Sequence, residues 1–260
     1  MAFTLGARAR QAGFSLQVHD AIDSTNAEAL RRARVGIRGP EWIVARNQSA
    51  GRGRRGREWI SPPGNLAVTL LMSVNMAPRR AALLGFVAGV ALHRAVRVAA
   101  PDADIALKWP NDLLAGDAKL AGMLLESEEN SGRLTVALGI GVNVAAAPQD
   151  LPYPATSLAA LGVATDAETL FSALSDEWVD AARLWDDGRG FEPIRNLWLE
   201  RARGRGQPIS VHLADRVIAG IFDTVDETGA LMIRDTDGRS VRITAGDVHF
   251  GQPARALEPY

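Results

Sequence analysis

The chain of 260 residues contains no cysteine, and this absence removes several chemistries. Thiol nucleophiles, paired redox cysteines, iron–sulfur clusters and cysteine zinc sites are excluded, and no disulfide indicates a secreted protein. Histidine is also scarce, with four scattered residues and no HExxH motif, and the chain has no GxSxG motif. Metal-centred hydrolysis and serine catalysis therefore have little support.

Aromatic residues and net charge are low as well. Aromatic side chains make up 6% of the chain, which argues against a row of aromatic rings that stack on nucleic-acid bases. The formal net charge is −1, which argues against a protein whose whole surface binds polyanions. The longest apolar run, at residues 81–92, is far shorter than the ~20 residues of a membrane span, and the first residues show no signal-peptide pattern. We therefore expect a buried helix at that run, a cytoplasmic protein and no membrane partner.

Hydrophobic periodicity and turn residues predict two domains, the first of mixed α/β type with a mainly antiparallel sheet. Its strands are expected at residues 14–22, 41–46, 67–74, 105–108, 119–126 and 134–144, and its helices at 25–35, 79–99, 167–186 and 191–202. The composition changes at residues 203–208, and short strands separated by Gly or Asp turns follow at 209–213, 217–224, 230–234 and 240–243. We divide the chain into residues 1–205 and a small all-β domain, residues 206–260.

The most distinctive motif is GRGRRGREW, residues 51–59, inside a polar loop that covers residues 47–65. Its arginines offer forked donors suited to phosphate or carboxylate, and its glycines let the backbone approach a ligand closely. The motif also matches GxGxxG, but Pro62 and Pro63 follow in place of a helix, so it is no dinucleotide fingerprint. A solvated basic loop and an RNA-binding Arg–Gly segment remain alternatives.

A second motif is KWPNDLL, residues 108–114, followed by KLAG, residues 119–122. Two lysines thus flank a turn that contains Asn111 and Asp112. Lysine suits an anion whose charge changes during a reaction, and a carboxylate at the end of a strand can act as a base or hold a metal. The alternative is an ordinary turn stabilised by Asn and Asp.

Two shorter motifs complete the pattern. Residues 24–26, STN, begin the first predicted helix, where Thr25 and Glu28 fit a capping box; such a helix start is also a polar binding platform. Residues 139–144, GIGVNV, form a strand with two glycines, which indicates either close approach of a ligand or backbone, or a bulge.

Taken in order and spacing, these motifs resemble those of the biotin–protein ligases (biotin–[acetyl-CoA-carboxylase] ligases). The resemblance covers roughly residues 15–145, and residues 207–252 resemble the C-terminal domain of the family. It implies an α+β catalytic domain distantly like class II aminoacyl-tRNA synthetases, with a small C-terminal SH3-like β-barrel. In such enzymes biotin and MgATP form biotinyl-5′-AMP, and a lysine of a biotin carboxyl carrier domain then attacks this intermediate.

The resemblance also implies roles for individual residues. Catalysis would rest on Arg54, Lys119 and Asp112, the last orienting or deprotonating the incoming lysine amine. The biotin site would comprise Ser24, Thr25, Asn26, Gln48, Gly51, Arg52, Gly53, Arg54, Lys119 and Gly122. The ATP or adenylate site would comprise Arg54, Arg57, Trp59, Lys108, Asn111, Lys119 and Asn143. The implied cofactors are ATP and Mg²⁺, without assigned metal ligands.

Some members of the family carry an N-terminal DNA-binding domain, whereas only about 14 residues precede the first predicted strand. We therefore expect the monofunctional form and no DNA partner. A lipoate–protein ligase is the alternative enzyme, although the Gly–Arg loop together with KWPND favours biotin. We also expect a homodimer, with the strand near residues 134–142 as the edge that pairs with its copy.

Overall fold

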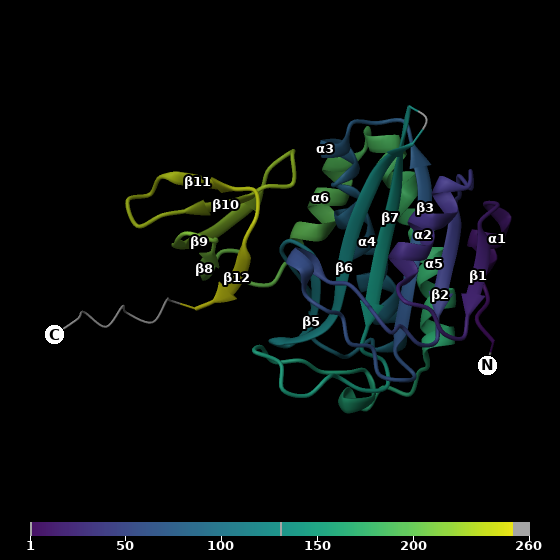
Figure 1. Cartoon of the computed structure of the whole chain (residues 1–260). Coiled ribbons are helices and arrows are strands. Elements are labelled where there is room, and N and C mark those ends of the chain that lie inside the picture. Colours follow the sequence, from purple (N-terminus) through teal and green to yellow (C-terminus); the bar gives the residue numbers. More distant parts are fainter. Residues whose placement is uncertain (1, 131, 252–260) are drawn as a thin grey trace.

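The computed structural model describes residues 2–130 and 132–251, which form a seven-stranded sheet carrying helices and a second, five-stranded sheet (Figure 1). The strand order of the first sheet is β1-β2-β3-β7-β6-β5-β4. Only β1 and β2 are parallel, so the predicted mainly antiparallel sheet is confirmed. Its strands are β1 (Ser15–His19), β2 (Glu41–Ala45), β3 (Leu66–Val74), β4 (Ile105–Lys108), β5 (Asp112–Ala115), β6 (Ala118–Asn130) and β7 (Arg133–Val142).

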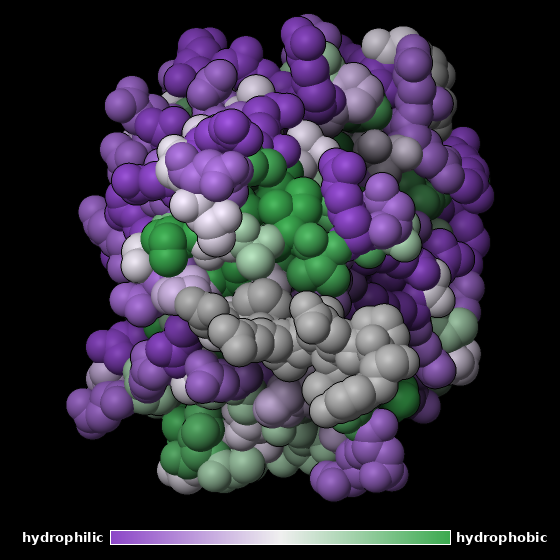
Figure 2. Space-filling view, turned by 90° about the vertical axis from the view of Figure 1, so that its left-hand side faces the viewer, coloured by the Kyte–Doolittle hydropathy of each residue, from purple (hydrophilic) through white to green (hydrophobic). Residues whose placement is uncertain are grey.

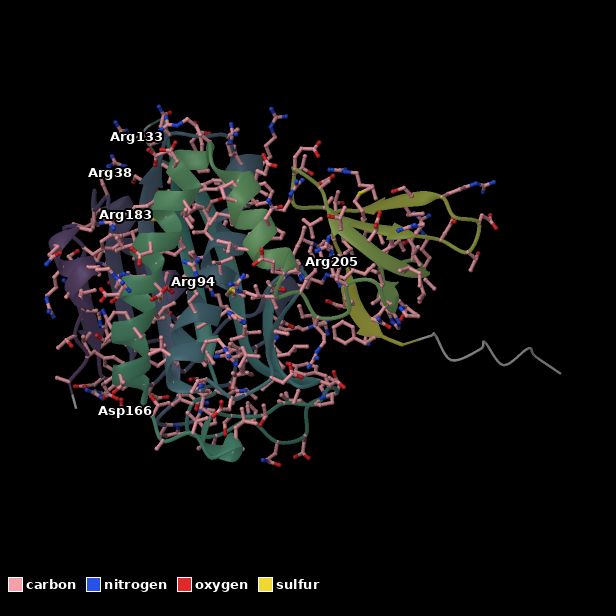
Figure 3. The ribbon with its side chains drawn as sticks, turned by 180° about the vertical axis from the view of Figure 1, so that it is seen from behind. Arg38, Arg94, Arg133, Asp166, Arg183 and Arg205 are labelled. Atoms are coloured by element: carbon pink, nitrogen blue, oxygen red, sulfur yellow. The ribbon has the colours of Figure 1, made fainter. Side chains whose placement is uncertain are left out.

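Helices cover both faces of this sheet because its strands bury alternate residues on opposite sides. On one face Ile43, Leu71 and Ala137 pack against α2 (Thr25–Arg34). On the other face Trp42 and Leu138 belong to the main core, together with α4 (Leu84–Ala99) and α5 (Ala167–Trp185). Seen from behind, α5 and α6 (Phe191–Leu199) lie in front of the sheet, with Asp166 where α5 begins (Figure 3).

The long apolar helix predicted from the sequence is a core element. Pro78 occupies its first helical position, and the helix consists of α3 (Pro78–Ala81) and α4, joined by Ala82 and Leu83 in helical conformation. The stretch Pro78–Ala99 is long and apolar enough to cross a membrane, but 72% of its most apolar window is buried inside the protein. Its burial explains its hydrophobicity.

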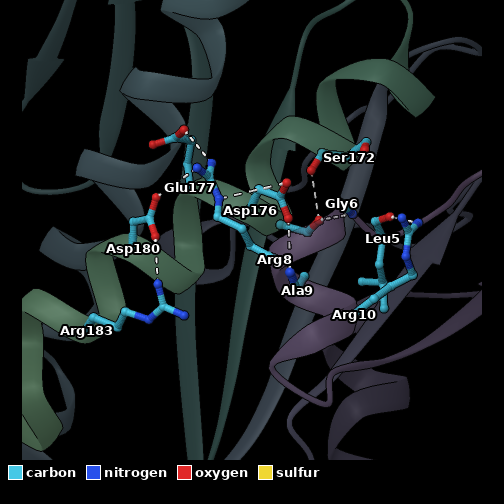
Figure 4. A network of polar contacts seen from close by, with 11 residues as sticks. Leu5, Gly6, Arg8, Ala9, Arg10, Ser172, Asp176, Glu177, Asp180 and Arg183 are labelled. Carbon is cyan, nitrogen blue, oxygen red and sulfur yellow. Dashed lines mark hydrogen bonds and ion pairs between the residues drawn. The ribbon is translucent and has the colours of Figure 1, made fainter.

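A short helix not predicted from the sequence, α1 (Ala7–Gln11), ties the start of the chain to α5 (Figure 4). The guanidinium of Arg8 lies 3.0 Å from Glu177 and 3.2 Å from Asp180. The carboxylate of Asp176 accepts a hydrogen bond from the backbone N–H of Ala9 at 3.0 Å. These contacts close the core at the end of the sheet where β1 lies.

The C-terminal domain is a five-stranded antiparallel sheet in the order β11-β10-β9-β8-β12, which confirms the predicted small all-β domain. Its strands are β8 (Pro208–His212), β9 (Val217–Val225), β10 (Leu231–Arg234), β11 (Ser240–Ile243) and β12 (Asp247–Phe250). The last strand was not predicted. The domain boundary predicted at residues 205/206 falls between α6 and β8. Figure 2 shows the molecule from the side of this domain, where a hydrophobic patch interrupts a hydrophilic surface.

The C-terminal domain is held against the first domain by specific contacts. The indole N–H of Trp109 donates a hydrogen bond to the carbonyl of Gly229 at 3.0 Å. Gly229 has φ of 82°, and a Cβ there would crowd Leu83 and Phe86, so glycine is required for this close approach. Asp247 of β12 reaches further, into the pocket described below.

The strand predicted to be a free sheet edge lies inside the sheet, and that prediction is wrong. β7 pairs along its whole length with β3 on one side and β6 on the other. Alternation of apolar residues does not distinguish an edge strand from an interior strand, so this pattern alone could not place β7 at an edge. Among the described residues, the edge strands of this sheet are β1 and β4, and β6 is also open on one side beyond Met123, because β5 pairs with β6 only as far as Gly122.

Candidate active site

One pocket gathers residues from all the sequence motifs. It opens between the start of α2, the loop of residues 47–65 (the arginine loop) and the middle of β6 and β7. Of the predicted site residues it is lined by Ser24, Thr25, Asn26, Gln48, Arg52, Gly53, Arg54, Arg57, Trp59, Asn111, Asp112, Lys119 and Gly122. Three others, Gly51, Lys108 and Asn143, lie outside it.

At its inner end the pocket presents uncharged hydrogen-bonding groups at the start of α2. The helix is capped by Ser24, whose side chain accepts from the backbone N–H of Ala27, and not by Thr25 as predicted. The Thr25 hydroxyl and backbone N–H instead donate to Gln48 Oε1, at 3.0 and 2.8 Å. Because the cap is shifted by one residue, Thr25 is free to hold Gln48 at the pocket wall.

A buried threonine that the sequence did not single out completes this end. The hydroxyl of Thr69 lies 2.8 Å from the hydroxyl of Thr25 and 2.6 Å from Oδ1 of Asn26. The amide nitrogen of Asn26 donates to Glu126 at 2.9 Å, and Arg52 lies 3.3 Å from the same carboxylate. The side chains of Thr25 and Asn26 are therefore fixed by bonds to the sheet, while that of Ser24 caps α2 itself.

The floor of the pocket contains glycines where neighbouring side chains approach. A Cβ on Gly139 would overlap the amide of Asn26, and a Cβ on Gly141 would overlap the indole ring of Trp59. Gly122 is the register partner of Gly141, and its Cβ would lie 3.2 Å from the same ring. The glycines thus admit the side chains of Asn26 and Trp59, whereas the GIGVNV motif was interpreted as close approach of a ligand or backbone, or as a bulge.

Lys119 is the cationic centre of the pocket. Its ammonium lies 2.8 Å from Asp112, and it also lies 5.7 Å from the ring centroid of Trp59 and 5.4 Å from that of Tyr153. Both distances are within the range of cation–π attraction. Tyr153 was not singled out in the sequence, since nothing in its local pattern indicates that it faces a lysine 34 positions earlier.

Arg54 enters the pocket from the tip of the arginine loop. Its guanidinium donates to Oδ1 of Asn111 at 3.0 Å, and the Asn111 amide nitrogen donates to the carbonyl of Met123 at 2.6 Å. Burial lowers the pKa of Arg54, against the opposing effect of Asp247 and Asp112. A guanidinium taken out of water in this way gains from an anionic ligand.

The other arginines of the loop reach the C-terminal domain. Arg55 and Arg57 lie 3.0 and 2.7 Å from the same carboxylate, that of Asp247 on β12. Partial burial would raise the pKa of Asp247, but the hydrogen bond from Arg57 and the nearby arginine charges lower it overall. The sequence missed Asp247 because it did not predict the strand that carries it.

Lys108 lies beside the pocket and not in it. Its register partner across the β4–β5 turn is Asp112, and its ammonium lies 5.5 Å from the ring of Phe250 in the C-terminal domain. Burial lowers the pKa of Lys108. Lys108 and Lys119 are the two lysines of the whole chain, so both primary amines of its side chains lie at this site.

A smaller cavity adjoins the pocket behind Lys119. Its walls come from Trp59 and Ile60 of the arginine loop and from Leu151 and Tyr153 of the segment of residues 144–156 (the proline loop). Asn143 lies at this cavity and is 2% exposed. Its amide nitrogen donates to the carbonyl of Thr156 at 3.0 Å, while its buried Oδ1 has no partner within the described part of the chain.

The carboxylates that line the pocket are Glu58, Asp112 and Asp247. In the described residues no three His, Asp or Glu side chains come together as a metal site.

Comparisons with known proteins agree on one family. A sequence model described as the biotin/lipoate A/B protein ligase family matches residues 18–143, and one described as the biotin protein ligase C terminal domain matches residues 205–251. The chain is 44% identical over 238 residues to a biotin–[acetyl-CoA-carboxylase] ligase of Paracoccus denitrificans, covering 88% of this chain and 98% of that protein. It is 32% identical to the bifunctional ligase/repressor BirA of Escherichia coli, over 87% of this chain and 71% of that protein.

Solved structures agree with this result. The biotin protein ligase from Aquifex aeolicus in complex with biotin and ATP superposes with a TM-score of 0.75 over 91% of this chain and 99% of that chain, at 23% identity. The ligase from Leishmania major in complex with biotinyl-5-AMP gives a TM-score of 0.60 over 89% and 99% of the two chains, at 25% identity. The predicted α+β fold is thereby confirmed.

Proposed function

The chain belongs to the biotin/lipoate A/B protein ligase family, and from that premise we propose that it attaches biotin to a lysine of a biotin carboxyl carrier domain. The reaction passes through biotinyl-5′-AMP, made from biotin and ATP. The observation that carries the proposal is the change of chemistry along one pocket, from uncharged hydrogen-bonding groups to the cations Lys119 and Arg54.

The dimensions of the floor support biotin. A cyclic urea has neutral donors and an acceptor, which Thr25, Asn26 and Gln48 can match without charge. Asn26 lies against Gly139 and Trp59 against Gly141, two residues further along β7, which corresponds to about 7 Å of strand. That spacing suits a short aliphatic acid chain, which would bring its carboxylate toward Lys119.

The smaller cavity supports a place for adenine. Its walls are flat and largely apolar, and the unpartnered Oδ1 of Asn143 is an acceptor suited to an exocyclic amine. A buried acceptor without a partner is costly, so a donor on the ligand would stabilise the complex. In this proposal Trp59 and Tyr153 contact the base, and Lys119 lies between the base and the biotin carboxylate.

In the first step a biotin carboxylate oxygen attacks the α-phosphorus of ATP. The bond between this phosphorus and the bridging oxygen breaks, and pyrophosphate leaves. Two negative groups must approach each other, and Lys119 with Arg54 would neutralise them as charge shifts in the transition state. The existing partners, Asp112 and Asn111, hold these two cations at the pocket before the anions arrive.

In the second step the amine of the carrier lysine attacks the acyl carbon and AMP leaves. The amine must lose a proton, and Asp112 is the carboxylate beside Lys119 that would orient or accept it. The intermediate is a mixed anhydride that water would hydrolyse, so closure of the loops over it protects it until the carrier lysine arrives.

Three finer points belong to the same proposal. Mg²⁺ would enter with the phosphates of ATP, because hard cations are held largely by phosphate oxygens and water. The protein would work in the cytoplasm, where ATP and carrier proteins are available. It would form a homodimer through the open edge of β6 beyond Met123, in place of the strand that we first expected.

The direct test is to incubate the protein with biotin, MgATP and a carrier domain, and to detect biotin on the carrier lysine by mass spectrometry. A parallel reaction replaces biotin with lipoate. Transfer of biotin without transfer of lipoate is the expected result. Transfer of lipoate alone would replace the proposal with the other activity of the family, and transfer of neither would contradict it.

A further inference from the structure

We propose that Asn65 is a positioning residue that joins the arginine loop and the proline loop into one lid over the pocket. Its relevance to catalysis rests on the function proposed above, but the coupling itself does not. Asn65 is the last residue of the arginine loop, it does not line the pocket, and it was not singled out in the sequence.

The side chain of Asn65 holds the first residues of the proline loop. Its Oδ1 accepts hydrogen bonds from three successive backbone N–H groups, those of Val144, Ala145 and Ala146, at 2.9, 2.9 and 3.1 Å. Its amide nitrogen donates to the carbonyl of Ala146 at 2.7 Å. Asn65 itself is 4% exposed, so these four bonds are largely shielded from water.

The residue before Asn65 adds a close backbone approach at the same place. Gly64 has φ of 86°, and a Cβ there would lie 2.8 Å from the Cβ of Ala145. The turn that ends the arginine loop thus packs directly on the residues that begin the proline loop. One asparagine and one glycine therefore join the roots of two segments that are 79 to 81 residues apart.

The two loops meet again around Lys119. Trp59 of the arginine loop and Tyr153 of the proline loop lie on the ammonium of Lys119, and the two loops supply most walls of the cavity beside Asn143. The shape of that cavity depends on the register of one loop against the other. The far end of the proline loop is fixed separately by the backbone of Lys119. Its N–H donates to the carbonyl of Pro154, and its carbonyl accepts from the N–H of Thr156. Asn65 therefore fixes the other end of the proline loop, at residues 144–146.

The test uses the full-length protein and the variant Asn65→Ala. Hydrogen–deuterium exchange without ligands should become at least about tenfold faster at residues 144–156 and also in the arginine loop, because four shielded bonds are lost together. In the enzyme assay KM for ATP should rise about tenfold or more while KM for biotin changes little. A larger share of biotinyl-AMP should also escape before transfer.

Two further variants separate positioning from general damage. Asn65→Asp keeps acceptors for the three N–H groups but places an acceptor oxygen where the amide donated to Ala146, so it should restore part of the exchange protection and of the affinity for ATP. Ser175→Ala removes a buried hydroxyl that bonds Gly6 at 2.8 Å, far from the pocket, and should leave loop exchange and KM for ATP unchanged.

The proposal is overturned if Asn65→Ala leaves exchange in both loops unchanged, or if only the proline loop responds. It is also overturned if Asn65→Asp behaves like Asn65→Ala, or if Ser175→Ala reproduces the change in KM. Should the alanine variant not fold, the aspartate variant is compared with wild type: the loss of the bond to Ala146 should speed exchange in both loops by a smaller factor, and unchanged exchange in either loop overturns the proposal. If the wild-type protein makes no adenylate, the proposed function fails while the exchange data still decide the coupling.

Discussion

Lys119 is held in the ligand-free pocket by contacts that substrates can replace. Its side chain is 19% exposed and lies 2.8 Å from Asp112, with aromatic rings on either side. The ammonium of a lysine is a compact charge on a flexible side chain, so it can move from one carboxylate to another at small cost in free energy. The guanidinium of an arginine instead binds its partners in a fixed, forked geometry. This residue can therefore follow negative charge from the carboxylate of biotin to the α-phosphate.

The first prediction concerns Lys119→Ala. Removing one preorganised cation should cost at least about 2 kcal/mol of transition-state stabilisation, or roughly 30-fold in the rate of adenylate formation. Biotin-dependent release of pyrophosphate measures it. The other lysine gives the matched control, because Lys108 lies outside the pocket and Lys108→Ala should lose less. A near-wild-type rate in Lys119→Ala would remove the residue from the mechanism.

The second prediction concerns His93 on α4 and the stability of the fold. Its Nε2 lies 3.2 Å from the carbonyl of Ile105, and burial, aided by the charge of Arg201, lowers its pKa from 6.5 to about 4. The unfolded chain therefore binds more protons in this range, and stability should fall as pH decreases from about 6.5 through 4. Urea unfolding at several pH values measures this decline. His93→Gln cannot titrate and should show a shallower decline; an identical slope would contradict the assignment.

At this scale the sequence predicted the residues that belong to compact motifs and missed those whose partners are distant. Ser24, Arg54 and Lys119 stand in strings whose residue types already indicate anion or polar binding. Asn65 and Thr69 look like ordinary loop and strand residues. Their hydrogen bonds join positions more than 40 residues apart, so only the folded chain shows what they hold.

At the scale of elements, the arginine loop is held by contacts to three other parts of the molecule. Arg54 bonds Asn111 at the β4–β5 turn, Arg52 pairs with Glu126 on β6, and Arg57 pairs with Asp247 on β12. Like charges this close in the sequence would repel one another if they were unpaired. Each of these arginines instead has a protein partner, so an arriving phosphate competes with existing contacts.

The third prediction concerns Arg54→Gly. Losing the buried guanidinium at the loop tip should weaken retention of biotinyl-AMP more than its formation, because a permanent charge that can hold the phosphate is removed. Released intermediate would then biotinylate lysines of an unrelated protein such as albumin, which mass spectrometry detects. Arg55→Ala is the control from the same loop, and it should leak less since Arg55 bonds Asp247. Labelling confined to the carrier lysine would show that retention does not depend on Arg54.

The fourth prediction concerns the glycine floor of β7. In Gly141→Ala the new methyl group overlaps the indole of Trp59 and must displace it. We expect an altered tryptophan fluorescence spectrum and a rise of about tenfold or more in KM for ATP, because Trp59 is a wall of the proposed adenine cavity. Gly85→Ala, on α4 in open space, should change neither quantity. Unchanged fluorescence and KM in Gly141→Ala would mean that the ring position is unimportant.

Elements with strong periodicity were predicted well, and short or ambiguous ones were not. The helices α2, α5 and α6 and the hairpin of β6 and β7 appear where the pattern placed them. β12 has four residues and lies between a Gly–Asp turn and the end of the domain, so its pattern is too short to read. The position of β7 within the sheet was wrong because long-range pairing, and not local pattern, decides which strand is an edge.

At the scale of the whole molecule, the pocket belongs to both domains. The first domain supplies most of its walls, while Asp247 from the C-terminal domain holds two arginines of the lid. The hydrogen bond from the indole of Trp109 to Gly229 also joins the two domains. Because Asp247 holds the arginine loop, a movement of one domain against the other would displace that loop. The two-domain organisation was predictable from composition, but this shared site was not.

The fifth prediction concerns association of two copies. The part of β6 beyond Met123 that β5 does not pair with lies next to the ion pair of Glu126 with Arg52, a residue of the pocket. We expect a homodimer at micromolar or higher concentration, tightened by biotin and ATP when the arginine loop closes near that edge. Sedimentation velocity with and without the two ligands measures it. A monomer in both conditions at roughly 100 μM, where even weak dimers are populated, would contradict the dimer and leave the ligase untouched.

One lysine lies in the pocket and the other beside it, and this placement affects how far the enzyme can acylate itself. The acyl-adenylate reacts with primary amines, yet outside this site the side chains of the chain offer arginines and no other lysine. A guanidinium stays protonated at any physiological pH and is a poor nucleophile. Biotinyl-AMP that escapes from the pocket therefore meets no other lysine side chain on the enzyme, and the enzyme biotinylates itself little.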